Sequence, residues 1–395
     1  MSKQILDKSK ELSEQVIAWR RYLHKHPELG FKEIGTAKFI EEQLISFGLK
    51  PRTGIGKTGI IASVGSGKPC IALRADMDAL PIQDSKEVSY ASQNAGVCHA
   101  CGHDAHVAML LGVAKILSGI QDQISGEIRF LFQPFEEGQD ATGLGGAKAM
   151  IKDGALEGVD AILGQHVHGG DLEAGCFQVK TGYFSAAVDT FKATIFGKGC
   201  HGAYPHFGID PIFLTAQVIN FVQGIISRKI DPLEPSVVSF GKIQGGSAPN
   251  VIPEEVKLEG TIRSLNPEIR KQIKLNLEKA FQSVESFGGS YQLDIMEGSS
   301  SIDNDTDLVA LLQQVASDFL PKDKILTGGL GMGAEDFADF MAIVPGAFYY
   351  LGVGLESPKE HHASDFDLDE SVLYLGTALL TETALRYLKS KKNEN

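Results

Sequence analysis

Residues 127–138 read EIRFLFQPFEEG, an apolar run of strand-forming residues that leads directly into two adjacent glutamates. Apolar runs at 70–73 and 160–165 also lead into polar clusters, and an apolar helical run spans 104–117. The residues at the three strand ends are Asp76 and Asp78, Glu136 and Glu137, and His166 and His168. Strands that alternate with helices predict an α/β layer around a mostly parallel sheet. Ligands bind beyond the carboxyl ends of such strands, so we expect the three polar clusters to converge.

The pattern changes after Gly182, where the order becomes strand, helix, strand, strand, helix, strand. This is the order of a ferredoxin-like α+β domain. We therefore predict that residues 185–295 form an inserted lid or dimerisation domain. Residues 1–184 and 296–395 then form one catalytic, metal-binding domain of the α/β class. A chain of 395 residues is longer than one hydrophobic core usually serves, which agrees with two domains.

Composition and charge exclude several classes of partner. The formal net charge is -13, which argues against binding to nucleic acid or to an anionic membrane surface. The N-terminal stretch MSKQILDKSKELSEQ does not read as a signal peptide, and no stretch approaches the ~18 apolar residues of a membrane span. Five Cys without a paired spacing pattern suggest a reducing compartment. We expect a cytoplasmic protein that acts on a small molecule.

The densest group of metal-competent residues is VCHACGHDAH at 97–106, with two Cys and three His. His and Cys are preferred ligands of zinc-like ions. A structural zinc knuckle would need a second CxxC or HxxxH half, and none occurs elsewhere in the chain. A redox pair formed by Cys98 and Cys101 remains an alternative, although such motifs lack flanking His. The pattern favours a catalytic metal site.

The adjacent pair Glu136 and Glu137 has a specific use in metal-dependent hydrolysis. One carboxylate can bind metal while its neighbour acts as general base, taking a proton from a metal-activated water and giving it to the leaving nitrogen. An acidic surface turn is the alternative, which the preceding apolar strand disfavours. A second pair, His361 and His362, precedes the last predicted helix and is by itself more typical of a surface feature.

Nine sequence features occur in a fixed order: HPELGFKE, RADMDALP, HACGHDAH, QPFEEG, GKGCHGAYPH, APNVIP, GTIRS, GAEDF and the late His pair. Together they resemble the metallopeptidase family of aminoacylases, hippurate hydrolases, indole-acetyl-amino-acid hydrolases and thermostable carboxypeptidases. Any one string is modestly specific, but the ordered set is highly so. The resemblance covers nearly the whole chain and implies two divalent metal ions per subunit, of zinc, manganese or cobalt.

The resemblance also implies individual roles. The implied metal ligands are Cys101 as a bridging thiolate, His103, Glu137, His166 and His362, the last chosen over His361 by its spacing to Phe366. The implied catalytic residues are Glu136 as general base, Asp78 as an orienting acid with Asp76 close by, and His201, which would stabilise the oxyanion and reach a partner subunit's active site. Asn250 and Arg263 are implied to hold the substrate carboxylate, a role that suits the Arg fork.

The chain departs from the family pattern at three positions. Many relatives have Met at the position of Cys98, which argues against a ligand role for that thiol. Relatives commonly have Ala at Phe135 and Gly at Cys200. We expect these changes to alter the volume of the pocket and to leave the chemistry intact.

The implied reaction is hydrolysis of the amide bond of an N-acyl amino acid or short peptide with a free carboxylate, of aminoacylase or carboxypeptidase type. We expect a homodimer or homotetramer. A deacetylase for N-acetyl-diaminopimelate in lysine synthesis is a narrower alternative, which the sequence does not separate. A non-catalytic metal or thiol redox sensor that uses Cys98 and Cys101 is an alternative of another class, but it leaves Glu136, Glu137 and His166 unexplained.

Overall fold

The chain divides into two compact units in its computed structural model, which describes residues 2–329 and 331–393. The first unit comprises Met1–Phe184, Asp303–Gly329 and Asp336–Asn395, and the second comprises Ser185–Ile302 and Leu330–Glu335. Each unit has its own hydrophobic core. The second unit is therefore an insertion in the first.

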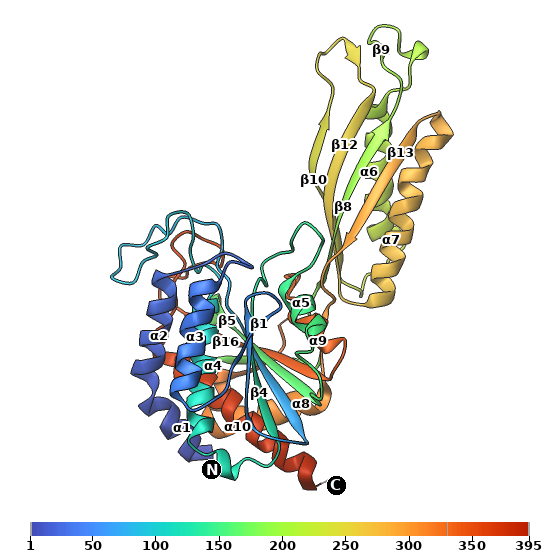
Figure 1. The fold of residues 1–395 in the computed structure, drawn as a ribbon. Coiled ribbons are helices and arrows are strands. Elements are labelled where there is room, and N and C mark those ends of the chain that lie inside the picture. The colour runs from blue at the N-terminus through green and yellow to red at the C-terminus, as the bar shows by residue number, and fades with distance from the viewer. Residues whose placement is uncertain (1, 330, 394–395) are drawn as a thin grey trace. The chain divides into compact units, whose positions relative to one another are not determined.

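A large sheet forms the centre of the first unit, and its described strands lie in the order β1-β2-β4-β3-β5-β16-β6-β15 (Figure 1). The central strands β4, β3, β5 and β16 run parallel, whereas β1 and β2 pair antiparallel on one flank and β6 pairs antiparallel with β16 on the other. The bounds are β1 Arg52–Ile55, β2 Gly59–Gly65, β3 Cys70–Asp76, β4 Glu127–Gln133, β5 Ala161–Glu173, β6 Phe177–Val179, β15 Ile325–Thr327 and β16 Gly346–Gly354. A separate ribbon pairs β7 Gly182–Ser185 with β14 Ile302–Asn304.

Helices cover both faces of the parallel strands. The crossovers β3–α4–β4 and β4–α5–β5 run in opposite directions along the sheet, so right-handed connections place α4 His103–Ser118 and α5 Gly146–Lys152 on opposite faces, as Figure 1 shows. Strand β3 is buried at every position, as expected of a parallel strand covered on both faces. The carboxyl ends of β3, β4 and β5 consequently open on one edge of the sheet.

Helix α4 is the central helix of this unit. It is buried on nearly all sides because it packs against the sheet and against α2 and α10, and its composition is apolar all round. The other helices of the unit are α1 Ser2–Glu11, α2 Ser13–Lys25, α3 Ile34–Ser46, α8 Thr306–Phe319, α9 Phe337–Met341 and α10 Leu373–Asn393. None of the helices in the described part of the chain is long and apolar enough to cross a membrane.

The second unit is a four-stranded antiparallel sheet, in the order β10-β12-β8-β13, with two helices. Its elements are β8 Ala187–Phe196, α6 Pro211–Arg228, β10 Ser236–Gly245, β12 Glu255–Ser264, α7 Pro267–Gln282 and β13 Ser290–Glu297, with a small ribbon of β9 Cys200–His201 and β11 Val251–Ile252. Alternate residues of β8 are buried, so one face of the sheet packs on α6 and α7. The predicted fold class, an α/β domain carrying a ferredoxin-like insertion, is confirmed.

The start of α6 is fixed by its own sequence. Asp210 accepts hydrogen bonds from the backbone nitrogens of Ile212 at 2.9 Å and Phe213 at 3.4 Å, and Pro211 occupies the first helical position. These contacts satisfy amides that the first turn otherwise leaves without partners.

We predict that Asp210→Ala lowers the opening free energy of α6 by about 1 kcal/mol, because the N-cap acceptor is lost. Hydrogen–deuterium exchange of the α6 amides measures this directly. Asp210→Asn keeps an acceptor oxygen at the same place and should exchange like the wild type. Equal protection of α6 in the Ala variant and the wild type would contradict the assignment.

Candidate metal centre

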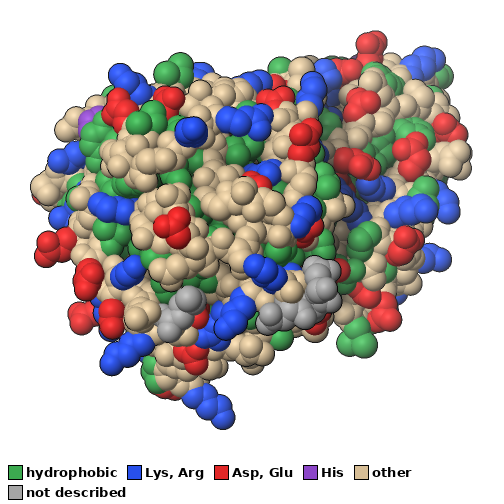
Figure 2. All heavy atoms as spheres, turned by 60° about the horizontal axis from the view of Figure 1, so that its bottom comes forward, with side chains coloured by type: hydrophobic (Ala, Val, Ile, Leu, Met, Phe, Trp, Pro, Cys, Tyr) green, Lys and Arg blue, Asp and Glu red, His purple; other side chains and the backbone are tan. Residues whose placement is uncertain are grey.

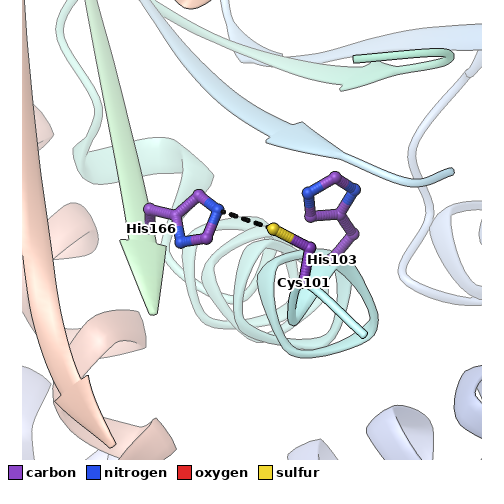
Figure 3. Close-up of side chains that lie close together, drawn as sticks. All are labelled: Cys101, His103 and His166. Atoms are coloured by element: carbon purple, nitrogen blue, oxygen red, sulfur yellow. Dashed lines mark hydrogen bonds between the residues drawn. The ribbon is translucent and has the colours of Figure 1, made fainter. Parts of the chain in front are cut away.

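The amino-terminal end of α4 meets the carboxyl end of β5 at the polar edge of the sheet. Gly102, directly before α4, has a φ of 92°, and a Cβ there would lie 2.3 Å from the Val167 side chain. Only glycine therefore allows the chain to turn this close to β5. The turn places Cys101 and His103 on either side of Gly102, and the Cys101 sulfur is directed at His166 (Figure 3).

Six of the predicted residues come together here in three overlapping groups. Within each group, one ligand atom from every residue lies within 4.8 Å of the others. The groups are Cys101, His103 and His166; Cys101, Glu137 and His362; and His103, Glu136 and Glu137. The Sγ atom of Cys101 lies 3.4 Å from Nε2 of His166, and Oε1 of Glu137 lies 3.1 Å from Nε2 of His362. Cys101 is the member common to the first two groups, so its thiol lies between two sets of donors.

His103 provides a test of whether a cation fits. Its Nδ1 lies 3.0 Å from the Asp78 carbonyl oxygen and 3.2 Å from Asp78 Oδ1. Its buried Nε2 has no hydrogen-bond partner among the described residues, yet lies 3.9 Å from both Glu136 Oε2 and Glu137 Oε1. A His held by a carboxylate on one nitrogen and directed at acidic oxygens with the other is typical of a metal ligand. The donor set, thiol, imidazoles and carboxylates, suits zinc-like or manganese-like ions.

Burial and charge shape the titration of the cluster. Burial, together with Glu137 and Glu136, raises the pKa of the Cys101 thiol well above its ordinary value. Burial, with His106 nearby, lowers the pKa of His166 well below its ordinary value. Burial opposes ionisation of Glu137, but the hydrogen bond to His362 and the proximity of His103 hold the pKa of Glu137 below its ordinary value. A thiolate in this surrounding requires a cation beside it.

The two late histidines have different surroundings. His362 has a φ of 63°, and its ring lies beside Glu137. Nε2 of His361 accepts a hydrogen bond from the Gly169 amide at 3.2 Å, and its ring packs on Phe366 with centroids 4.8 Å apart. Burial lowers the pKa of His361 to about 3, so its ring is neutral. The geometry groups His362, and not His361, with Cys101 and Glu137.

A buried relay supports the backbone next to His166. The Val167 amide donates to Nε2 of His106 at 2.9 Å, so that nitrogen carries no proton. The proton therefore resides on Nδ1, which lies 2.6 Å from Asp76 Oδ1, and Arg74 donates to Asp76 Oδ2 at 2.7 Å. Burial opposes ionisation of Asp76, but Arg74 holds its pKa well below the ordinary value. Asp76 is thus a member of this relay, and its Oδ2 also lies 3.6 Å from Nε2 of His103.

Asp336 completes the relay from a distant part of the chain. Arg74 donates to its Oδ1 at 3.1 Å, and the Gln133 side-chain amide donates to both oxygens. The Ala147 amide donates to Oδ2 at 3.0 Å. The sequence reasoning missed His106, Arg74 and Asp336 as site-supporting residues. His106 lies in the 97–106 cluster and Asp336 lies in the GAEDF string, so both belong to sequence motifs that are quoted above.

The remaining predicted site residues lie in the second unit. His201 is exposed on β9, and its Nδ1 accepts from the Ala203 amide at 3.1 Å, so Nε2 carries the proton of the neutral ring and can donate it. Asn250 is exposed just before β11. Arg263 is half-buried on β12, where its guanidinium donates to Thr261 Oγ1 and to the Ile262 carbonyl. Their roles toward a substrate stay predictions.

On the face drawn in Figure 2, basic and acidic side chains are interspersed. Neither sign of charge dominates that face.

Residues 72–386 match the peptidase family M20/M25/M40. The chain belongs to this family. It is 39% identical over 389 residues to thermostable carboxypeptidase 2 of Saccharolobus solfataricus, with 96% of each chain covered. It is also 39% identical over 387 residues to N-acetyl-L-cysteine deacetylase of Bacillus subtilis, covering 96% of this chain and 90% of that one.

A solved relative connects the family to metal. The Bacillus subtilis YXEP protein, described as a dinuclear metal-binding peptidase of the M20 family, is 33% identical, has a TM-score of 0.82, and is matched over 96% of this chain and 99% of its own. The predicted family is therefore confirmed, and with it a metal-dependent hydrolase of amide bonds. The M20 relatives also agree with an inserted domain.

We predict that His106→Leu weakens metal binding about 10- to 100-fold, because removing an outer-shell partner misplaces the ligand it orients. His166 loses its support when the Val167 amide has no acceptor. Competition with a chromogenic chelator measures the affinity. His99→Leu is a matched control, since His99 is equally buried in the same segment and neither of its ring nitrogens has a hydrogen-bond partner in the described structure. Equal affinities of the His106 and His99 variants would count against the relay.

Proposed function

We propose that the protein hydrolyses the amide bond of N-acyl amino acids or short peptides that bear a free carboxylate, with Glu136 as general base. The observation that carries this proposal is the overlap of two donor groups at Cys101, with Glu136 beside them. Five side chains could hold two divalent ions, and Cys101 would be shared between them. Glu136 would lie beside these ligands without being one of them. A single structural ion would not require a second acidic group at the same point.

Two divalent ions, when bound, would supply Lewis acidity that polarises the amide carbonyl and the attacking water. Glu136 follows Phe135 in the turn after β4, and its Oε2 lies 3.9 Å from Nε2 of His103. From this position Glu136 takes a proton from the water and then delivers it to the leaving nitrogen. Asp78 has a separate role, because it orients His103 through Nδ1 and accepts a hydrogen bond from the Glu137 amide at 3.1 Å.

The proposal that the substrate is an N-acyl amino acid rests on three residues of the second unit. Arg263 offers a guanidinium fork suited to a carboxylate, and Asn250 adds an amide donor. His201 has a proton available on Nε2 to donate to the oxygen that gains charge in the transition state. Two relatives are named N-acetyl-L-cysteine deacetylase and thermostable carboxypeptidase 2, and both names describe cleavage of an amide bond in a molecule with a free carboxylate.

Zinc, manganese and cobalt are all compatible with this donor set, because thiol and imidazole favour the softer ions while carboxylates accept the harder ones. A cytoplasmic location and a homodimer or homotetramer remain our predictions. The redox alternative required Cys98 and Cys101 to act as a pair. Cys98 is instead buried, with Lys86 Nζ 3.9 Å from its sulfur, and Cys101 faces His166.

We predict that Glu136→Gln lowers kcat by at least ~100-fold with little change in bound metal, since the general base is lost while the proposed ligands stay. Glu137→Gln is the informative partner variant, because it should lose metal as well as activity. Metal analysis of both proteins, combined with turnover of an N-acetyl amino acid, distinguishes them. Full turnover by Glu136→Gln would contradict the proposed mechanism.

We predict that Arg263→Ala raises KM for an N-acyl amino acid by roughly 10-fold or more, because a bidentate charge-assisted contact is worth about 1.5–3 kcal/mol. The same variant should discriminate poorly between an N-acyl amino acid and its methyl ester, whereas the wild type should strongly prefer the free acid. Arg228→Ala, on α6, serves as a control for charge alone. A wild-type preference for the acid in the Arg263 variant would remove Arg263 from the proposal.

A further inference from the structure

The loop between α2 and α3 contacts the turn that carries Glu136. We propose that Glu33 is a positioning residue that holds this turn, and thereby the general base, through its hydrogen bond to the Phe135 amide. The inference rests on the proposed function, since it assigns a support to the residue proposed as base. The Phe135 amide donates to Oε1 of Glu33 at 2.9 Å, across 102 residues of sequence.

The turn after β4 needs such support because of its backbone. Phe135 has a φ of 42°, a left-handed conformation that is unfavourable for an aromatic residue. Strained conformations persist only where the surroundings over-determine them. Here the amides of Phe135 and Glu137 both donate to carboxylates, of Glu33 and Asp78, and the Phe135 carbonyl accepts from the Gly146 amide at 3.0 Å. Glu136 lies between the two anchored amides.

Glu33 itself is committed to this contact. Its side chain is fully buried, and in the described part of the chain it has no ion pair with a basic residue. Its other oxygen, Oε2, accepts from the Thr58 hydroxyl at 2.5 Å. Burial raises the pKa of Glu33 to about 7. Burying a carboxyl group without a neighbouring cation costs free energy unless hydrogen bonds compensate for the lost water. One of the hydrogen bonds that Glu33 accepts comes from the turn that carries Glu136.

The Phe135 ring fixes the same turn from its other side. A Cβ on Gly30 would lie 1.8 Å from the ring, so the ring fills the space that this glycine leaves open. Phe31 packs edge-on against the ring with centroids 4.9 Å apart. The Phe135 side chain is therefore packed against the loop that also carries Glu33.

The loop is in turn connected to the end of β3. The Ala79 amide donates to the Glu28 carbonyl at 2.8 Å, and Leu29 and Ala79 form a parallel bridge. Asp78, the residue directly before Ala79, contacts His103 and the Glu137 amide. The loop thus ties together two of the polar strand ends, so displacement of Glu33 should affect Glu136 while Asp78 still anchors Glu137.

The test measures kcat, KM and metal content of the full-length, metal-loaded protein on an N-acetyl amino acid. Glu33→Ala should lower kcat ~10- to 100-fold, because a small misplacement of a reacting group costs this much. KM and metal content should stay close to the wild type. Glu33→Gln should recover activity to within a few-fold, since its amide oxygen can accept from Phe135 and its nitrogen can donate to the Thr58 hydroxyl. Thr58→Val should remain nearly wild type, because it leaves the Phe135 contact in place.

Gly30→Ala provides a second route that leaves Glu33 unchanged. Its added methyl overlaps the Phe135 ring, so it should also lower kcat with metal retained, and it decides the matter if Glu33→Ala does not fold. Wild-type kcat in Glu33→Ala, loss of metal in that variant, or equal loss in Glu33→Gln and Glu33→Ala would overturn the inference. Glu136→Gln is assayed in parallel: if it is fully active, the proposed function fails, whereas an inactive Glu136→Gln beside an active Glu33→Ala overturns only the role of Glu33.

Discussion

Concentrated negative charge at the carboxyl edge of the first unit's sheet is the constraint on which the rest of this unit depends. Asp76, Glu136 and Glu137 all approach His103 within 4 Å, and a thiol lies beside them. Like charges in a buried site repel each other and also lose hydration. Asp76 is neutralised by Arg74, but among the described residues Glu137, which meets Cys101 and His362, has no ion pair with Lys or Arg. Bound metal would complete the balance of charge there.

Much of this edge follows from local sequence signals. Three apolar strands are each followed by acids or histidines, and parallel neighbouring strands bring such side chains together at one edge of the sheet. Strands β4, β3 and β5 are parallel neighbours. The same reasoning holds for the 97–106 cluster, because a glycine followed by an apolar helix places Cys101 and His103 at the helix start. The strand and helix order of the insertion similarly sufficed for its ferredoxin-like fold.

The supports of the site could not be read in this way. Arg74 meets Asp336 across 262 residues of sequence, and Glu33 meets Phe135 across 102. Side-chain contacts over such separations leave no periodic pattern in the sequence that would reveal the pairs. Helix α3 was not predicted either, since its amphipathic signal is weak and Glu33 precedes it without a side-chain cap. Spacing to Phe366 favoured His362 over His361, and in the structure Nε2 of His362 lies 3.1 Å from Glu137.

The strained residues indicate where accuracy of placement matters in this fold. Among the described residues, the non-glycine positions with positive φ are Phe31, Lys57, Phe135 and His362. Each such position costs about 1–3 kcal/mol, so a fold without need for them would be expected to relax them. These four are not scattered: Phe31 packs on Phe135, Lys57 Nζ lies 3.7 Å from the Phe31 ring centroid, and His362 contacts Glu137. The strain is therefore gathered around the turn of Glu136 and Glu137, where the regular strand β4 ends and where the position of two carboxylates decides what the site can do.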